Sequence, residues 1–144
     1  ETSKVLGLDR RKMSKSDENA IFLSDSPDEI RQKVAQMITD PQRARKADPG
    51  NPDICNVFSF HKLYSAEEMP PRIDSECRKA QIGCVECKKL MAESLGEALA
   101  PIREKRPYYE ARPEMVTEIM QTGNQQANRV ARETMKEVRE AVGI

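Results

Sequence analysis

The longest helical pattern of the chain covers residues 84–110, which read CVECKKLMAESLGEALAPIREKRPYYE. Its apolar side chains recur three or four positions apart and therefore fall on one face of an α-helix. This face consists of Cys87, Leu90, Met91, Leu95, Ala98, Leu99 and Ile102. Pro101 and Pro107 interrupt the pattern and are expected to bend or split the helix. The stretch predicts a long α-helix with an apolar face that shorter helices cover.

A shorter helix is predicted upstream of the long one, beginning at Ser26. Ser26 can cap the helix, Pro27 suits its first position and Glu29 completes a capping box. The helix should end near Thr39, because Pro41 disfavours helical geometry in the residue before it. The inward face is expected to hold Ile30, Val34, Met37 and Ile38.

The segment between these two helices predicts a further helix over residues 52–64. Pro70-Pro71 is expected to stop a turn that starts at Ser65, which leaves residues 72–83 short and mixed. His61, the only histidine, is predicted to be a packed or surface residue and not a catalytic base. The inward residues are expected to be Ile54, Val57, Phe58 and either His61 or Leu63.

Two helices are predicted after the long one. Pro113 should start a short helix, and Gly123 should be either a break or a tight packing point. The last helix is expected over residues 124–142. Its inward face would carry Ala127, Val130, Ala131, Thr134, Val138 and either Ala141 or Val142.

The composition fits this mainly α-helical bundle. Of the 144 residues 33% are charged and 4% are aromatic, with no Trp, which is lean for a sheet sandwich. Lys plus Arg is 24 and Asp plus Glu is 24, so nucleic-acid binding would require a local basic patch. No run of about 18 apolar residues and no signal-peptide pattern is present. A cytoplasmic chain without a membrane span is therefore expected.

Residues 11–16, Arg-Lys-Met-Ser-Lys-Ser, lie outside every helical pattern and predict an exposed loop. We call this segment the lysine loop. Lys12 and Lys15 carry compact ammonium groups that suit phosphate oxygens, and Ser14 and Ser16 add hydroxyl donors. The residue types therefore indicate a phosphate-binding loop. They leave open the alternative of a solvated basic loop.

Four cysteines, Cys55, Cys77, Cys84 and Cys87, form a second candidate site. Cys84 and Cys87 make a C-x2-C pair at the start of the long helix, where free amides and the helix dipole favour thiolates. Cys77 precedes this pair in a C-x6-C spacing, and Cys55 would have to join by tertiary packing. Disulfides are disfavoured in a cytoplasmic chain. Residue chemistry alone leaves a structural zinc, an iron–sulfur cluster and unlinked thiols open.

Several segments resemble one known family. Lys12–Ser16 spells KMSKS, the signature of class I aminoacyl-tRNA synthetases, and its flanks Gly7–Arg11 and Asp17–Ile21 resemble bacterial tryptophanyl-tRNA synthetases. Ala98–Lys105 is similar to the part of that family's long helix that carries a proline, and Gln126–Ala131 is similar to its closing helix. The resemblance covers nearly the whole chain and corresponds to the C-terminal part of the family. The chain is therefore expected to be a piece of a longer protein.

The resemblance implies a function for the lysine loop. It implies a tryptophan–tRNA ligase, which activates tryptophan with ATP and Mg²⁺ and transfers it to tRNA(Trp). Lys12 and Lys15 would be the catalytic contacts to the departing pyrophosphate. Ser14 and Ser16 would donate hydrogen bonds to phosphate, and Met13 would lie near the adenine as part of the ATP site.

The resemblance also implies a division into domains. Residues 1–24 would end a Rossmann-like catalytic domain, and residues 25–144 would form the helical tRNA- and anticodon-binding domain. The intact family member is a homodimer whose tryptophan pocket lies in the absent half, so this segment alone is expected to be inactive. The competing hypothesis is a free-standing helical module, bearing a metal or cluster, that binds tRNA or regulates without catalysis.

A subset of bacterial tryptophanyl-tRNA synthetases carries a four-cysteine 4Fe–4S site with a C-x6-C-x2-C tail, which Cys77, Cys84 and Cys87 match. The resemblance implies that these three, with Cys55, bind such a cluster, and structural zinc is the alternative. Basic residues flank these cysteines and are candidates for contacts to tRNA phosphates. They are Arg78, Lys79, Lys88 and Lys89.

Overall fold

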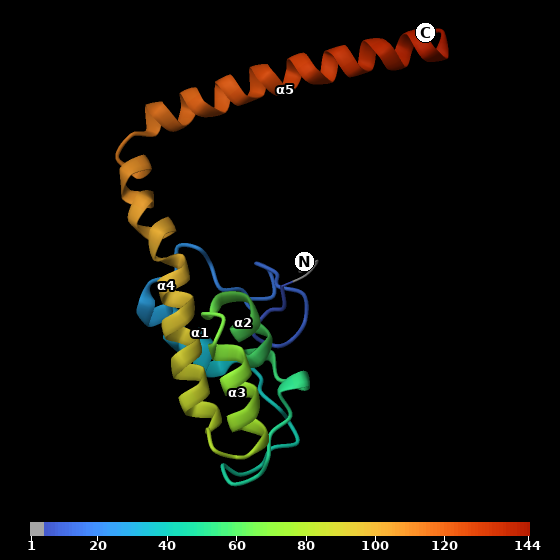
Figure 1. Ribbon diagram of the computed structural model, residues 1–144. Coiled ribbons are helices and arrows are strands. Elements are labelled where there is room, and N and C mark those ends of the chain that lie inside the picture. Colours follow the sequence, from blue (N-terminus) through green and yellow to red (C-terminus); the bar gives the residue numbers. More distant parts are fainter. Residues whose placement is uncertain (1–4) are drawn as a thin grey trace. The chain divides into compact units, whose positions relative to one another are not determined.

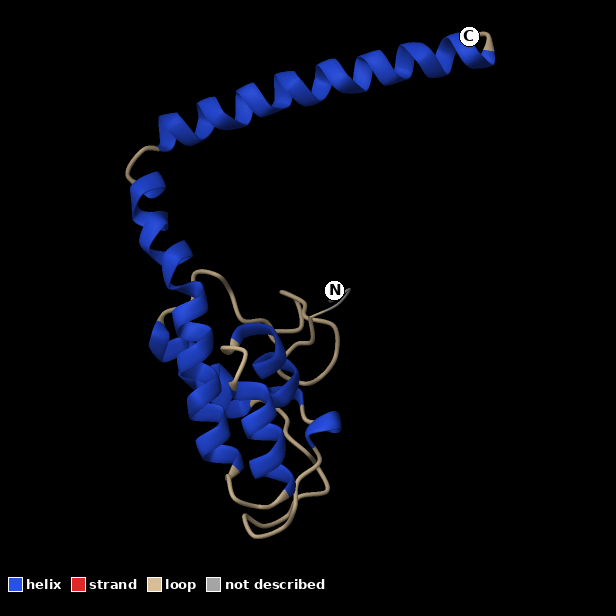
Figure 2. Ribbon diagram, in the orientation of Figure 1, coloured by secondary structure: helices blue, strands red, loops and turns tan. Residues whose placement is uncertain are grey.

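The computed structural model describes residues 5–144, and its ribbon is drawn in Figure 1. Within this range the chain forms five α-helices and one short 3-10 helix but no strand (Figure 2). A single antiparallel bridge joins Leu6 to Lys12. The prediction of a mainly α-helical chain is confirmed. Of the predicted domain over residues 1–24, residues 1–4 lie outside the described part. No helix in the described range is long and apolar enough to cross a membrane.

Helix α1 spans Pro27–Gln36 and begins as predicted. The hydroxyl of Ser26 accepts a hydrogen bond from the amide of Glu29 at 3.3 Å, and the Glu29 carboxylate accepts one from the amide of Ser26 at 2.7 Å. These two bonds complete the predicted capping box. They satisfy amides that have no partner inside the helix.

The end of α1 differs from the prediction. The helix ends at Gln36, before Thr39, because the amide of Ile38 donates to the carbonyl of Leu8 at 3.0 Å and does not continue the helix. The predicted inward position of Ile38 is wrong, since 43% of this residue is exposed. The other three predicted inward residues, Ile30, Val34 and Met37, are buried.

The predicted helix over residues 52–64 is divided into η1 (Pro52–Ile54) and α2 (Asn56–Tyr64). Cys55 separates them, because its backbone is extended, with φ −90° and ψ 121°. His61 is buried and Leu63 is exposed, so His61 is the inward member of that pair and the packed one of its two predicted placements holds. The buried apolar residues of α2 are Val57, Phe58 and Phe60.

Helix α3, which spans Met69–Arg78, overturns the prediction that Pro70-Pro71 stops the chain after a turn. The two prolines lie in the first turn of α3, where an amide hydrogen has no partner inside the helix. Proline therefore removes nothing that the helix needs at these positions. The segment over residues 72–83, expected to be short and mixed, is helical as far as Arg78.

Helix α4 spans Cys84–Glu110 and has the predicted bounds. It is not split at Pro101 or Pro107. The buried residues of its apolar face are Cys87, Met91, Leu95 and Leu99, whereas Ala98 and Ile102 are exposed. With residues of α1, α2 and α3 they form one hydrophobic core.

The chain divides into two compact units, Glu1–Arg103 and Glu104–Ile144. The hydrophobic core lies in the first unit. In the second unit α5 runs from Pro113 to Val142 without the break predicted at Gly123. No residue of α5 is buried, so the predicted inward face of its second half is exposed. The helix ends at Gly143, whose φ of 76° is readily adopted only by glycine.

Candidate active-site loop and cysteine site

The lysine loop presents its two lysines to solvent. Lys12, Lys15 and Ser16 are exposed, while Met13 and Ser14 are half-buried. Met13 packs against the hydrophobic core, which ties the middle of the loop to the helical body. Neither lysine forms an ion pair with any residue in the described range. Both ammonium groups are therefore free to bind an anion.

Hydrogen bonds hold the two serines and fold the loop back on its flanks. The hydroxyls of Ser14 and Ser16 lie 2.9 Å apart and share one hydrogen bond. The amide of Gly7 donates to the carbonyl of Arg11 at 2.7 Å, which closes the turn before the loop. The amide of Leu8 donates to the carbonyl of Asn19 at 2.9 Å, which brings the two flanks together.

Arg11 differs from the lysines because it is paired within the turn. Its Nε donates to Asp9 Oδ2 at 2.6 Å, and its backbone amide donates to Asp9 Oδ1 at 3.0 Å. Desolvation raises the pKa of the Asp9 carboxyl, but hydrogen bonds from Arg11 and Asn19 outweigh it and leave this pKa below its ordinary value of 3.8. The Asp9 carboxylate is therefore the ion-pair partner of Arg11, and the two lysines are the cations of the loop that remain without such a partner in the described range.

The base of the loop is fastened to α2. Asn56, the first residue of α2, is 1% exposed. Its side-chain nitrogen donates to the carbonyl of Gly7 at 2.8 Å and approaches the carbonyl of Leu8 at 3.4 Å. Leu8 is itself a member of the hydrophobic core. The loop thus leaves the helical body from a fixed point.

The four cysteines lie in one neighbourhood, which we call the cysteine site. Every pair among them is close enough for one thiolate to raise the pKa of another. Cys55 and Cys87 are buried, and Cys77 and Cys84 are half-buried. Cys55 immediately precedes α2, Cys77 lies near the end of α3, and the other two cysteines lie in the first turn of α4. Helix packing therefore joins cysteines that are up to 32 positions apart in the sequence, from Cys55 to Cys87.

Burial sets the ionisation of these thiols. It raises the pKa of Cys87 to about 12, with repulsion from the other three cysteines acting in the same direction. Burial also raises the pKa of Cys55, against which the nearby amides of Phe58 and Val57 act. The pKa of Cys77 is raised by burial as well, and the Arg43 cation opposes this shift. Burial therefore favours the neutral form of Cys55, Cys77 and Cys87.

Arg43 is the cation of the cysteine site. Its Nη1 points at Cys77 Sγ, 3.8 Å away, and at Cys84 Sγ, 4.0 Å away, while its Nη2 donates to the carbonyl of Lys46 at 2.6 Å. Its buried Nε has no hydrogen-bond partner in the described chain. The guanidinium therefore faces two sulfur atoms, and at Cys77 it opposes the rise in pKa that burial causes.

The space around Cys77 depends on a glycine. A Cβ at Gly50 would lie 2.5 Å from Cys77 Sγ, which is closer than atoms can approach without displacement. The amide of Gly50 also donates to the carbonyl of Cys77 at 3.0 Å. Gly50 is therefore required by close approach and not by an unusual backbone angle.

His61 lies against the cysteine site but is not free. Its Nε2 is 3.3 Å from the carbonyl and 3.5 Å from Sγ of Cys87, and its Nδ1 is 2.8 Å from the hydroxyl of Ser65. Burial lowers the pKa of His61, so the neutral ring is favoured. This arrangement agrees with the prediction of a packed histidine.

Across residues 5–144, no three His, Cys, Asp or Glu side chains converge tightly enough to hold one metal ion. A tetrahedral zinc with Zn–S bonds of about 2.3 Å needs its four sulfurs about 3.8 Å apart. Thiolates that bind a cube-shaped cluster stand farther apart, because each one binds a different iron.

The structure brings two of the four predicted tRNA-binding residues together, Lys88 and Lys89. Arg78 is engaged in ion pairs with Asp53 at 2.8 Å and Asp74 at 3.0 Å, and Lys88 donates to the carbonyl of Ala35 at 2.7 Å. Lys88 and Lys89 line a hollow of about 310 Å³ together with Cys84, and Lys89 also lines an open hollow of about 550 Å³ beside Cys84. Three further basic residues, which sequence reasoning did not connect with this site, line the larger hollow: Arg43, Arg45 and Lys46.

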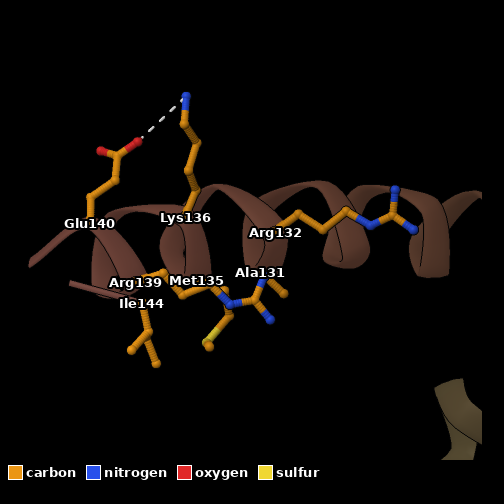
Figure 3. Close-up of a pocket in the computed structure, with 7 residues that line it drawn as sticks. All are labelled: Ala131, Arg132, Met135, Lys136, Arg139, Glu140 and Ile144. Carbon is orange, nitrogen blue, oxygen red and sulfur yellow. Dashed lines mark ion pairs between the residues drawn. The ribbon is translucent and has the colours of Figure 1, made fainter. Parts of the chain in front are cut away.

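A hollow of about 620 Å³ lies on α5, and Figure 3 shows the residues around it. All seven lie between Ala131 and Ile144, on the last turns of α5 and just past its end, and no other residue in the range 5–144 lines the hollow. The sticks for Lys136 and Glu140 point to the side opposite Met135 and Ile144 (Figure 3). The hollow is thus the surface of a single helix and does not form a binding site by itself.

Known proteins resemble this chain along its whole length. The family model described as tRNA synthetases class I (W and Y) matches residues 3–100. The tryptophan–tRNA ligase of Aquifex aeolicus is 47% identical and aligns with 100% of this chain and 37% of its own length. That of Thermotoga maritima is 41% identical, over 98% of this chain and 43% of its own.

A solved structure has the same fold. The crystal structure of tryptophanyl-tRNA synthetase from Campylobacter jejuni, complexed with ADP and tryptophan, matches with a TM-score of 0.78 and 27% identity. The match covers 100% of this chain and 44% of that one. The chain thus spans about two fifths of the length of the curated relatives it matches.

The helical fold, the KMSKS loop and the family match define a class I tRNA synthetase. Within that class, the chain belongs to the tryptophanyl-tRNA synthetase family, with bacterial relatives. The predicted family is therefore confirmed.

Proposed function

We propose that this chain is the C-terminal part of a tryptophan–tRNA ligase, which activates tryptophan with ATP and transfers it to tRNA(Trp). The observation that carries the proposal is the lysine loop, with two accessible lysines that have no ion-pair partner among residues 5–144, on a hydrogen-bonded base fixed to α2. The names of the relatives support the choice of tryptophan. We further expect the intact enzyme to be cytoplasmic and homodimeric, with its tryptophan pocket in the part that precedes this chain.

In the activation step a carboxylate oxygen of tryptophan attacks the α-phosphorus of ATP. A new C–O–P bond forms, the bond from this phosphorus to the bridging oxygen breaks, and pyrophosphate leaves with the electron pair. Negative charge grows on the leaving oxygens, so the ammonium groups of Lys12 and Lys15 stabilise the transition state more than the ground state. Mg²⁺ enters with ATP and binds the same phosphates.

The remaining loop residues position the nucleotide. In this proposal the hydroxyls of Ser14 and Ser16, which bond to each other in the free loop, exchange that bond for phosphate oxygens. Met13 stays packed on the core while its backbone faces the adenine. Anchoring by Met13 would let the loop close over ATP without leaving the helical body.

The experiment that tests the proposal substitutes the two lysines in the intact polypeptide. Lys12→Ala and Lys15→Ala should each lower tryptophan-dependent ATP–pyrophosphate exchange by about 100-fold or more, the loss typical for one preorganised charge-stabilising group. The KM for tryptophan should stay unchanged, because the lysines act on the nucleotide. Lys105→Ala, an exposed lysine of α4, is the matched control. Undiminished exchange in both loop variants would refute the assignment.

For the tRNA, we propose that phosphates meet the basic hollow beside Cys84. Lys89, Arg43, Arg45 and Lys46 line it, and cations clustered on one wall attract a polyanion more than scattered ones. Glu86 also lies in this wall and reduces its positive charge. Lys79 and Lys88 remain candidates at the edge of this region, and Arg78 would first have to leave Asp53 and Asp74.

For the cysteines, we propose a 4Fe–4S cluster held by Cys55, Cys77, Cys84 and Cys87. Three features support the fit: all four thiols lie in one neighbourhood, Arg43 faces two of the sulfurs, and Gly50 leaves room for Cys77. When bound, the cluster would act as a covalent cross-link between the elements that carry the cysteines. Arg43 would offset the charge of the thiolates, and His61 would stay neutral against Cys87.

A further inference from the structure

We propose that Asn19 is the positioning residue of the lysine loop, fixing the loop backbone so that Lys12 and Lys15 meet the pyrophosphate together. The proposal rests on the function proposed above. Asn19 lies outside the KMSKS motif and is 4% exposed. It does not reach out to solvent, and its side chain is directed into the turn that the loop forms.

Three hydrogen bonds join the Asn19 side chain to the loop. Its Oδ1 accepts from the amide of Ser14 at 2.8 Å, and its Nδ2 donates to the carbonyl of Lys12 at 3.2 Å and to Asp9 Oδ1 at 2.8 Å. One amide thus spans the backbone on both sides of Met13. These bonds fix the two peptide groups that carry the first lysine and the first serine of the motif.

The partners determine which way the amide points. The amide hydrogen of Ser14 can only be donated, so an oxygen must face it. The carbonyl of Lys12 and the carboxylate of Asp9 can only accept, so the nitrogen must face them. No other neutral side chain of this size offers an acceptor on one side and two donors on the other. The chemistry of the pocket is therefore specific for asparagine.

The close approach of Gly7 completes the pocket. A Cβ at Gly7 would lie 2.5 Å from Asn19 Cγ and 2.9 Å from the backbone oxygen of Asn19. Asn56 holds the other side of this residue through the Gly7 carbonyl at 2.8 Å. The loop is therefore connected to the helical body through a short chain of contacts: Asn19 to Gly7, and Gly7 to Asn56.

This arrangement separates two possible roles of Asn19. If Asn19 only fills space, Asn19→Asp should be tolerated, because aspartate has nearly the same shape, and Asn19→Ala should be the more damaging change. If its donors position the loop, Asn19→Asp should be the more damaging one. Aspartate keeps the bond from the Ser14 amide but loses both donated bonds and sets a second carboxylate against Asp9.

We would measure ATP–pyrophosphate exchange by the intact polypeptide with Asn19→Ala and Asn19→Asp. We expect Asn19→Ala to lower kcat/KM for ATP by about tenfold and Asn19→Asp by about 100-fold, with the KM for tryptophan unchanged. Hydrogen exchange of the amides in residues 12–16 gives a second readout that needs no substrate. The Ser14 amide should lose protection in Asn19→Ala and keep it in Asn19→Asp.

The matched control is Asn128→Ala on α5, where an exposed asparagine makes one bond, to the carbonyl of Asn124 at 3.0 Å. Exchange activity and loop protection should both be unchanged in it. Wild-type activity in both Asn19 variants, or greater damage from alanine than from aspartate, would overturn the proposal. If Lys12→Ala and Lys15→Ala are also fully active, the proposed function fails instead. Impaired lysine variants with active Asn19 variants refute the positioning role alone.

Discussion

The lysine loop and the cysteine site belong to the same compact unit but are held in different ways. In the loop the ammonium groups of Lys12 and Lys15 are exposed, and buried asparagine side chains hold the loop backbone by hydrogen bonds. In the cysteine site the thiols are buried or half-buried, and packing of helices brings them together. A cation that acts on a departing anion must be fixed yet accessible, whereas grouped interior thiols suit a structural bond.

Each region contains one glycine that matters through close approach. A Cβ at Gly7 would collide with Asn19, and a Cβ at Gly50 would collide with Cys77. Neither glycine has a positive φ, so alanine tests the contact and not the backbone angle. The two substitutions form a matched pair that separates the loop from the cysteine site.

Of the two glycine substitutions, Gly7→Ala is expected to have the larger effect. The new Cβ would meet both the side chain and the backbone oxygen of Asn19, so a side-chain rotation alone cannot relieve the collision. The loop should shift by about an ångström, which typically costs about 100-fold in rate. ATP–pyrophosphate exchange by the intact polypeptide measures this loss.

Gly7→Ala should leave the cysteine site unaffected, so its metal content should equal that of the wild type. Equal loss of metal and of exchange would mean that the two regions do not behave as separate units. Full activity of Gly7→Ala would show that the loop does not depend on the contact with Asn19.

Gly50→Ala is expected to have a smaller effect, and to lower the metal content while the exchange activity is retained. Wild-type protein purified without air should be brown and contain about four irons and about four sulfides per chain. In Gly50→Ala the Cys77 sulfur must move away from a Cβ at 2.5 Å, so iron and sulfide should fall well below the wild-type values. Pyrophosphate exchange should be retained.

Cys77→Ser provides the reference for loss of one ligand, and Gly96→Ala the control, because a Cβ at Gly96 has nothing within 4 Å. A colourless wild-type protein holding one zinc would overturn the cluster proposal. Unchanged iron in Gly50→Ala would show that Cys77 is not confined by this glycine.

Most of the helical fold could be predicted from local patterns. The capping box at Ser26 located the start of α1, and apolar spacing located both ends of α4. The predictions were wrong where a tertiary contact, or the position of a residue within a helix, determined the local structure. The amide of Ile38 donates to the carbonyl of Leu8, so Ile38 lies outside α1. Pro70-Pro71 lies in the first turn of α3, although it was expected to end a turn. Gly123 did not break α5, since one glycine in a helix costs only about 1 kcal/mol.

The two sites differ in how much the sequence reveals. The KMSKS letters point to the lysines directly, because the chemical groups are contiguous in the chain. Their supports, Asn19 and Asn56, follow no periodicity and are separated by 37 positions. Arg43 is close in sequence to Arg45 and Lys46, but its position facing Cys77 and Cys84 depends on the fold. Supporting residues are thus harder to predict than the groups they support.

The smallest effect is expected from Ser26→Ala, which affects the helical body and neither site. The substitution removes the hydroxyl that accepts from the Glu29 amide, and loss of such a cap costs about 1 kcal/mol. The melting temperature should fall by roughly 2–4 °C, measured by circular dichroism. Metal content and exchange activity should not change. A change in either would mean that α1 transmits strain to the loop or to the cysteines.

The same capping box predicts a dependence on pH. The backbone amide of Ser26, and then its side chain, hold the pKa of Glu29 below its ordinary value of 4.5. The unfolded chain therefore binds this proton first as the pH falls, so the stabilisation is complete above about pH 4.5 and is lost below it. Glu29→Gln removes the titration but keeps the shape. The melting temperatures of wild type and Glu29→Gln should differ near neutral pH and converge in acid. Parallel curves down to about pH 3 would show that the Glu29 carboxylate adds nothing to the cap.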